Sequence, residues 1–209
     1  FRVIRSNLDF MLSKKGEVQS IMFTSFNPGS GKTFISANLS VALALAGKRV
    51  ILLEMDIRKG SAKSEDGTVP AGITNYLSGK VSGIRDIIRK SEWHDTLDVI
   101  TSGPVPPNPA ELLLSNRLDM LMEELRREYD FILIDTVPYG VVADAQVINR
   151  IADLCIYVIR EGRFDRRLLP DVEKLYTDGR LSHMAVVLNE VCYEQAGYYG
   201  YYGYYGYGY

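Results

Sequence analysis

The feature that most constrains the fold is a glycine-rich loop between a strand-like run and a helical run. Residues 19–25 read QSIMFTS, residues 26–33 read FNPGSGKT, and residues 34–47 read FISANLSVALALAG. Successive backbone N–H groups of such a loop point into one concavity, and the following helix adds the positive end of its dipole, so the loop suits phosphate. The pattern predicts an α/β fold that binds a nucleotide.

The residue types in the loop match the parts of a phosphate site. Lys32 is a cation for the β- and γ-phosphates of ATP, and the Thr33 hydroxyl is a ligand for Mg²⁺. The full pattern has glycine five positions before Gly31, where this chain has Phe26. We predict that the stretch contacting ATP consists of Pro28, Gly29, Ser30, Gly31, Lys32, Thr33 and Phe34.

Three acidic residues end apolar, strand-like runs. Glu54 and Asp56 end RVILLEMD, and Asp135 ends FILID. Residues 54 and 56 face the same side of a strand, and two such carboxylates are costly unless a cation lies between them. A single acid after a buried strand is the usual Mg²⁺ partner in nucleoside-triphosphate hydrolases of this kind. These residues predict an Mg²⁺ site formed by Thr33, Glu54 and Asp135, and a catalytic set of Lys32, Glu54, Asp56 and Asp135.

Strand-like and helical runs alternate along the whole chain, which is typical of a mostly parallel sheet with helices on both faces. The fold class predicted is therefore α/β, similar to the P-loop NTPases. Strands are expected at 19–25, 49–56, 97–102, 130–136, 154–160 and 184–190, and helices near 1–12 and at 33–46, 84–90, 109–129, 143–151 and 166–178.

Two further residues have alternative interpretations. Asp144 precedes a helical run, so it either caps that helix or lies near the γ-phosphate. Asn189 ends the last predicted strand, where it either binds a nucleotide base or serves a turn.

The C-terminal residues 198–209 read YYGYYGYYGYGY, with eight tyrosines, four glycines and no aliphatic or charged side chain. Such a segment has no means of building a core, so residues 192–209 are expected to form a disordered tail after a folded domain of residues 1–191. A phosphate loop and a string of phenols in one chain predict a kinase that modifies its own tail. The predicted phosphoacceptors are Tyr198, Tyr199, Tyr201, Tyr202, Tyr204, Tyr205, Tyr207 and Tyr209.

Composition narrows the class of partner. The net charge is −2, so no strong field attracts nucleic acid. No apolar run reaches the roughly 18 to 20 residues that span a bilayer. Cys155 and Cys192 lack metal-site spacing and are expected to be buried free thiols of a reducing compartment. The chain begins without Met inside a helical pattern, so it is expected to be part of a longer protein.

Five segments in one order resemble the cytoplasmic catalytic domain of bacterial protein-tyrosine kinases that regulate capsule and exopolysaccharide synthesis. They are NPGSGKT, LLEMDIRK, GPVPPNPAELL, LIDTVP and the tyrosine-rich C-terminus. The resemblance implies an ATP- and Mg²⁺-dependent kinase that autophosphorylates its tail between subunits. It departs at Glu54, where the family usually has Asp.

The resemblance also implies partners. Family members dock an arginine-bearing N-terminal helix on a neighbouring subunit, and Arg2 and Arg5 match those arginines. The resemblance implies a homo-oligomer, in some cases a ring, together with a transmembrane polysaccharide co-polymerase segment in the same or a separate chain and a cognate tyrosine phosphatase. It implies a cytoplasmic domain tethered to the inner membrane.

Two alternatives remain from the sequence. One is a partitioning or positioning ATPase of the same fold, although such enzymes usually carry a lysine where this chain has Asn27. The other is a nucleotide-binding scaffold with weak catalysis, whose tail is an interaction segment.

Overall fold

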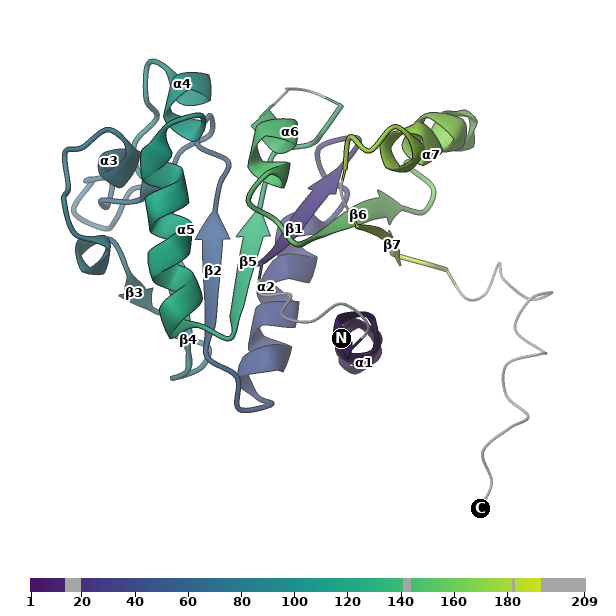
Figure 1. The fold of residues 1–209 in the computed structure, drawn as a ribbon, viewed down its shortest axis with the longest axis horizontal. Coiled ribbons are helices and arrows are strands. Elements are labelled where there is room, and N and C mark those ends of the chain that lie inside the picture. Colours follow the sequence, from purple (N-terminus) through teal and green to yellow (C-terminus); the bar gives the residue numbers. More distant parts are fainter. Residues whose placement is uncertain (14–19, 141–143, 182, 193–209) are drawn as a thin grey trace.

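The computed structural model describes residues 1–13, 20–140, 144–181 and 183–192, and Figure 1 shows its fold. Seven strands form one sheet in the order β3-β4-β2-β5-β1-β6-β7. Neighbouring strands are parallel except β3 and β4, which are antiparallel. The bounds are β1 Ser20–Ser25, β2 Val50–Glu54, β3 Arg89–Lys90, β4 Leu97–Ile100, β5 Phe131–Asp135, β6 Leu154–Arg160 and β7 Met184–Asn189.

Helices cover both faces of the sheet, which confirms the predicted fold class. On one face α1 (Arg2–Ser13) packs on α2 (Lys32–Ala44), and α2 packs on the central strands. On the other face lie α3 (Ile73–Leu77), α4 (Pro109–Leu113), α5 (Asn116–Glu128), α6 (Asp144–Asn149) and α7 (Leu169–Thr177).

The core is split by the sheet because side chains alternate along each strand. In β1, Ile21 and Phe23 are fully buried on the α2 face, whereas Met22 is fully buried on the opposite face. Both faces of the central strands are apolar, as expected for parallel strands covered on two sides.

All six predicted strands are present, each within two residues of its expected ends. The helix predicted at 84–90 is wrong, because one turn of 3-10 helix at Ile84–Asp86 leads into β3. The single helix predicted at 109–129 is also wrong. Ser115 is extended, with φ −71° and ψ 148°, and separates α4 from α5.

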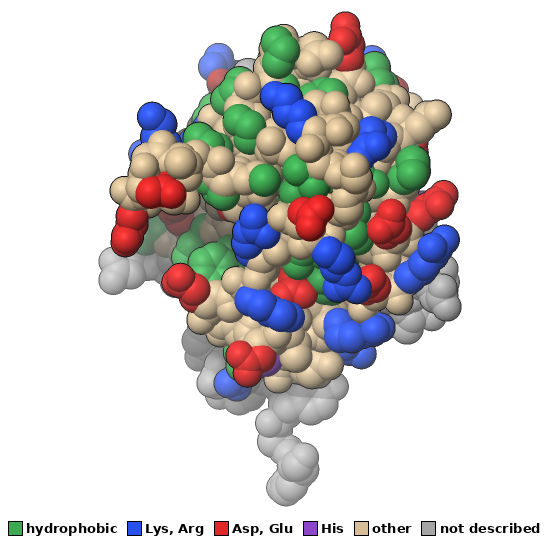
Figure 2. All heavy atoms as spheres, turned by 90° about the vertical axis from the view of Figure 1, so that its left-hand side faces the viewer, with side chains coloured by type: hydrophobic (Ala, Val, Ile, Leu, Met, Phe, Trp, Pro, Cys, Tyr) green, Lys and Arg blue, Asp and Glu red, His purple; other side chains and the backbone are tan. Residues whose placement is uncertain are grey.

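Cys155 is buried in β6, but Cys192 is exposed, which corrects the expectation that both thiols are buried. Figure 2 faces the side that carries α3 and β3, where basic and acidic side chains are intermixed. Within the described part of the chain, no helix is long and apolar enough to cross a membrane.

The carboxyl ends of β1, β2 and β5 meet at one edge of the sheet. In the strand register Asp135 of β5 pairs with Phe23 of β1 on one side and with Glu54 of β2 on the other. The loop after β1 and the acids that end β2 and β5 are therefore neighbours, at the edge where ligands bind in open α/β sheets.

Candidate active site

The loop between β1 and α2 is held in a tight backbone conformation. Gly29 and Gly31 have φ values of 74° and 96°, which glycine adopts at little cost. The Ser30 hydroxyl donates to the carbonyl of Asn27 at 2.9 Å. No described side chain caps the start of α2, so the first amides of that helix are free to face an anion.

Lys32 is the first residue of α2 and is only 8% exposed. Burial lowers the pKa of its ammonium group, and the nearby carboxylates of Asp135 and Asp56 partly oppose that shift. The sheet edge therefore holds a buried cation among acids, an arrangement suited to a polyanionic ligand bound with a metal ion.

Asp135 and Thr33 are in direct contact. The Thr33 hydroxyl donates to Oδ2 of Asp135 at 2.6 Å. Burial raises the pKa of Asp135 to about 6, although Thr33 and Lys32 lower it and Glu54 adds to the rise. The other carboxylate oxygen, Oδ1, is buried without a hydrogen-bond partner among the described residues.

The unpaired oxygen and the Thr33 hydroxyl fit a hard cation such as Mg²⁺, which takes oxygen ligands and keeps several waters. Among the described residues no group of three or more His, Cys, Asp or Glu side chains is arranged to hold a metal by itself. A Mg²⁺ ion at this edge would therefore take most of its ligands from phosphate oxygens and water, as in nucleotide sites.

Glu54 and Asp56 lie beside the phosphate loop in a cleft of about 510 Å³. Burial raises the pKa of Glu54, and a hydrogen bond from the backbone of Ser102 partly opposes this rise. Strand β2 ends at Glu54, so Asp56 belongs to the following turn rather than to the strand. The side chains that converge on the cleft include Lys32, Thr33, Glu54, Asp56, Ser102 and Asp135.

The ends of β6 and β7 hold the outer side of the phosphate loop. Asn189 donates through Nδ2 to the carbonyl of Ser30 at 3.1 Å, and Arg160 donates to the carbonyl of Gly29 at 2.9 Å. Residue 31 has a φ of 96°, which strains any residue with a Cβ, and a Cβ there would also lie 2.2 Å from Nδ2 of Asn189. Arg160 was not predicted from the sequence, because an arginine that ends a strand carries no local sign of its contact with a distant loop.

Asp144 makes a contact that neither of its two predicted roles includes. It is the first residue of α6, and both of its oxygens accept hydrogen bonds from Arg58, at 2.6 and 2.9 Å. The Asp144 side chain is 4% exposed. The bridge ties α6 to the turn that carries Asp56, a role that the sequence did not reveal because the two residues are far apart along the chain.

The remaining predicted residues lie at the margin of the site or outside it. Pro28 is exposed in the loop, and Phe34 is exposed on α2, where it makes an edge-to-face contact with Phe1. Arg2 is exposed, and Arg5 donates to the carbonyl of Ala42 in α2 of the same chain. The predicted phosphoacceptor tyrosines lie outside the described residues, as does all of the predicted tail except Cys192.

Fold and site together define a class of protein. A parallel sheet, a glycine loop running into α2, a buried lysine and a threonine–aspartate pair at the next strand end make a P-loop nucleotide-binding domain. The comparison with known families agrees, since the AAA domain profile matches residues 18–165.

Individual relatives show which family within this class the chain belongs to. The chain is 36% identical over 192 residues to tyrosine-protein kinase YwqD of Bacillus subtilis, which is 90% of this chain and 79% of YwqD. The solved kinase domain of the Escherichia coli tyrosine kinase ETK superposes with a TM-score of 0.80 at 31% identity, covering 91% of this chain and 74% of that one. The chain belongs to the bacterial protein-tyrosine kinases, and it is an enzyme of that family.

Two other similarities concern the length of a relative and the fold. AmsA of Erwinia amylovora is 34% identical over 203 residues, which is 95% of this chain but only 27% of AmsA. The septum site-determining protein MinD of Pyrococcus horikoshii superposes with a TM-score of 0.62 at 22% identity, covering 81% of this chain and 69% of that one. The likeness to MinD shows a shared fold alone.

Proposed function

We propose that this kinase transfers the γ-phosphoryl group of ATP to the tyrosines of its own C-terminal cluster, between subunits of a homo-oligomer. The observation that carries the proposal is the placement of β7. Its last residue, Asn189, lies against Ser30 of the phosphate loop, so the chain continues toward residues 198–209 from the edge that holds Lys32 and Asp135.

The binding roles proposed for the site follow from its contacts. The loop amides and Lys32 bind the β- and γ-phosphates, with Pro28, Gly29, Ser30, Gly31, Thr33, Phe34 and Asn189 completing the nucleotide site. Thr33, Asp135 and Glu54 hold Mg²⁺, directly or through water. When bound, Mg²⁺ neutralises charge on the phosphate oxygens.

The transfer itself needs little covalent chemistry from the protein. The tyrosine oxygen forms a bond to the γ-phosphorus, the bond from that phosphorus to the β,γ-bridging oxygen breaks, and ADP leaves. The phenol proton passes to a carboxylate of the cleft. Glu54 and Asp56 both line the cleft, and either carboxylate can accept this proton.

The wider role is proposed from the relatives. The much greater length of AmsA supports a longer protein or a partner chain with a transmembrane polysaccharide co-polymerase segment, which tethers this domain to the cytoplasmic face of the inner membrane. Names such as CapB of Staphylococcus aureus support a function in capsule or exopolysaccharide synthesis and export. A cognate phosphatase would reset the tail, and nucleic acid is not among the proposed partners.

Arg2 and Arg5 are proposed as contacts to the neighbouring subunit. Arg5 uses one guanidinium nitrogen on Ala42 of its own chain, and α1 presents Arg2 to solvent. A segment of twelve residues spans at most about 40 Å when fully extended, which is enough to enter an adjacent site.

A mixing experiment tests transfer between subunits. The variant Lys32→Met should lose at least about 100-fold of its tail phosphorylation, because it lacks the buried cation for the phosphates. When a mass-tagged Lys32→Met protein is mixed with wild-type protein, ATP and Mg²⁺, its residues 198–209 should become phosphorylated, as read by mass spectrometry.

Two outcomes count against the proposal. Phosphate on the wild-type tail but none on the tagged variant shows transfer within one chain. No phosphate on residues 198–209 of the wild-type protein rules out self-phosphorylation and favours the scaffold alternative.

A further inference from the structure

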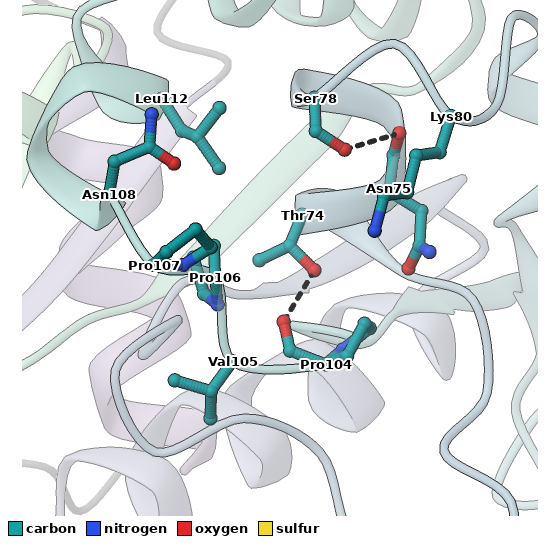
Figure 3. Close-up of a pocket in the computed structure, with 10 residues that line it drawn as sticks. All are labelled: Thr74, Asn75, Ser78, Lys80, Pro104, Val105, Pro106, Pro107, Asn108 and Leu112. Atoms are coloured by element: carbon teal, nitrogen blue, oxygen red, sulfur yellow. Dashed lines mark hydrogen bonds between the residues drawn. The ribbon is translucent and has the colours of Figure 1, made fainter.

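A second, smaller pocket lies between α3 and the proline-rich segment that leads into α4 (Figure 3). Its volume is about 230 Å³, which is below the range of about 300 to 1,000 Å³ of most small-molecule sites. A space of this size holds a single large side chain.

One wall of this pocket is apolar and stiff. Pro106 and Pro107 follow Val105, and Leu112 of α4 closes the end. Proline fixes the backbone, so this wall is preformed, and Val105 is 58% exposed. Such a surface suits the flat face of an aromatic ring.

The opposite rim offers hydrogen-bond donors and a positive charge. The hydroxyls of Thr74 and Ser78 already donate to the carbonyls of Pro104 and Asn75, as the dashed lines in Figure 3 show. Lys80 is exposed and forms no ion pair with the described residues, and the side-chain nitrogen of Asn75 makes no hydrogen bond with them. The lining contains one cation and no carboxylate, and the neighbouring carboxylate of Glu111 already accepts a hydrogen bond from Asn108 at 2.6 Å, so Lys80 can attract an anion to the rim.

This pocket adjoins the catalytic cleft. Gly60 lines the cleft, and a Cβ at that position would lie 2.8 Å from Cγ2 of Val105, which lines the pocket. Two hydrogen bonds join the segments that form the wall between the cleft and the pocket. The Ser61 amide donates to the Gly103 carbonyl at 2.9 Å, and the Gly103 amide donates to the Ser61 hydroxyl at 2.8 Å.

We propose that this pocket is a phosphotyrosine subsite for the C-terminal tail. It takes a tyrosine that has already been phosphorylated, with the ring on Val105 and Pro107 and the phosphate on Lys80 and Asn75, while another tyrosine of the same tail enters the cleft. The repeated Tyr-Tyr-Gly unit of residues 198–206 supplies such pairs at constant spacing. The inference rests on the proposed tail phosphorylation and adds that the kinase prefers a tail that already carries a phosphotyrosine.

Direct binding tests the subsite. Two synthetic peptides of residues 198–209, one unmodified and one phosphorylated at Tyr204, are titrated into the protein with ADP and Mg²⁺ saturating the phosphate loop. The phosphopeptide should bind at least about tenfold more tightly, because a charge-assisted contact adds to the ring contact. Lys80→Ala should bring the two affinities within about twofold.

Matched controls separate this pocket from general electrostatics. Lys48→Ala removes an exposed lysine just before β2, at the opposite end of that strand from the cleft, and should keep the tenfold preference. Val105→Asp should also lose the preference, whereas Leu45→Asp, at another exposed aliphatic residue, should keep it. Equal affinities for the two peptides in the wild-type protein, or an equal loss of preference in the Lys48→Ala control, would overturn the proposal.

The order of phosphorylation separates the subsite from the proposed function. When the wild-type reaction is stopped with about a tenth of the chains modified, those chains should already carry several phosphates. Lys80→Ala should give singly phosphorylated chains first. Identical distributions in the two proteins refute the subsite and leave tail phosphorylation standing, whereas an unmodified tail in the wild-type protein refutes the proposed function itself.

Discussion

Asp135 is a single residue whose buried position makes its ionised form unfavourable. Its carboxylate is 8% exposed, one oxygen accepts from Thr33, and the other has no partner among the described residues. Burial therefore dominates and raises its pKa to about 6. A cation bound beside Asp135 would therefore favour its ionised form.

A pH-dependent gain in stability follows for Asp135→Asn. The folded-state pKa of about 6 lies above the ordinary value of 3.8, so the stability linked to protonated Asp135 is complete below about pH 4 and is lost as the pH rises through 6. At pH 8 the free energy of unfolding of the variant should be about 2 to 3 kcal/mol higher than that of the wild-type protein. At pH 4 the free energies of unfolding of the two proteins should be equal. Urea unfolding of nucleotide-free protein measures this.

A control of opposite sign is available in Asp130. The hydrogen bond from Arg49 lowers the pKa of that carboxyl, so Asp130→Asn should lose stability near neutral pH and change little in acid. If Asp135→Asn shifted stability equally at pH 4 and pH 8, its carboxylate would not be the source of the strain.

At the scale of elements, the bridge between Arg58 and Asp144 joins the turn after β2 to the first residue of α6. Asp144→Asn keeps the shape but removes the charge, so the turn that carries Asp56 should loosen. Because Arg58 is 42% exposed and can regain water, the cost should be about 1 to 2 kcal/mol in unfolding free energy, with about a tenfold loss in kcat for tail phosphorylation.

The matched control breaks a bridge away from the cleft. Asp119→Asn removes the partner of Arg150 on the more exposed contact between α5 and the end of α6, and should change stability by less than about 0.5 kcal/mol and kcat not at all. Equal kinetic losses in both variants would mean that Asp144 acts through general stability alone.

The elements also show what a sequence can predict. Six parallel strands were predictable, since each is an apolar run followed by a turn or a polar residue, although β7 is only partly buried. β3 was not, because Arg89 and Lys90 are exposed and carry no hydrophobic pattern. The break before α5 was missed because the helical periodicity of residues 109–129 outweighed the Ser115–Asn116 start signal.

The residues of the candidate site also fall into those that the sequence predicts and those that it does not. Residues that share a local motif, such as Lys32 and Thr33, or that end adjacent strands, such as Glu54 and Asp135, were placed together from the sequence, and the structure brings them into one cleft. Contacts that depend on how distant segments pack, such as Arg160 on Gly29, carry no local signal and needed the fold.

For the whole molecule, the proposed tail modification predicts a change in assembly. Each phosphotyrosine adds roughly −1.5 to −2 charges to a chain whose net charge is only −2, so modified tails should repel one another. Light scattering after size exclusion should show a larger species before incubation with ATP and Mg²⁺ and a smaller one afterwards.

The Lys32→Met protein provides the reference, because it should stay at its initial mass under the same treatment. A protein with all eight tyrosines of residues 198–209 changed to Phe tests the same point from the acceptor side. An unchanged mass in fully phosphorylated wild-type protein would disconnect tail charge from assembly, even if the kinase reaction proceeds.

The contact between Asn189 and Ser30 also has a mechanical meaning. Asn189 ends β7 three residues before Cys192, where the described chain ends, and its amide is bonded to the backbone of the phosphate loop. A pull on the C-terminal segment therefore loads a strand that is fastened to the nucleotide pocket. The end of β7 and the phosphate loop are therefore expected to move together.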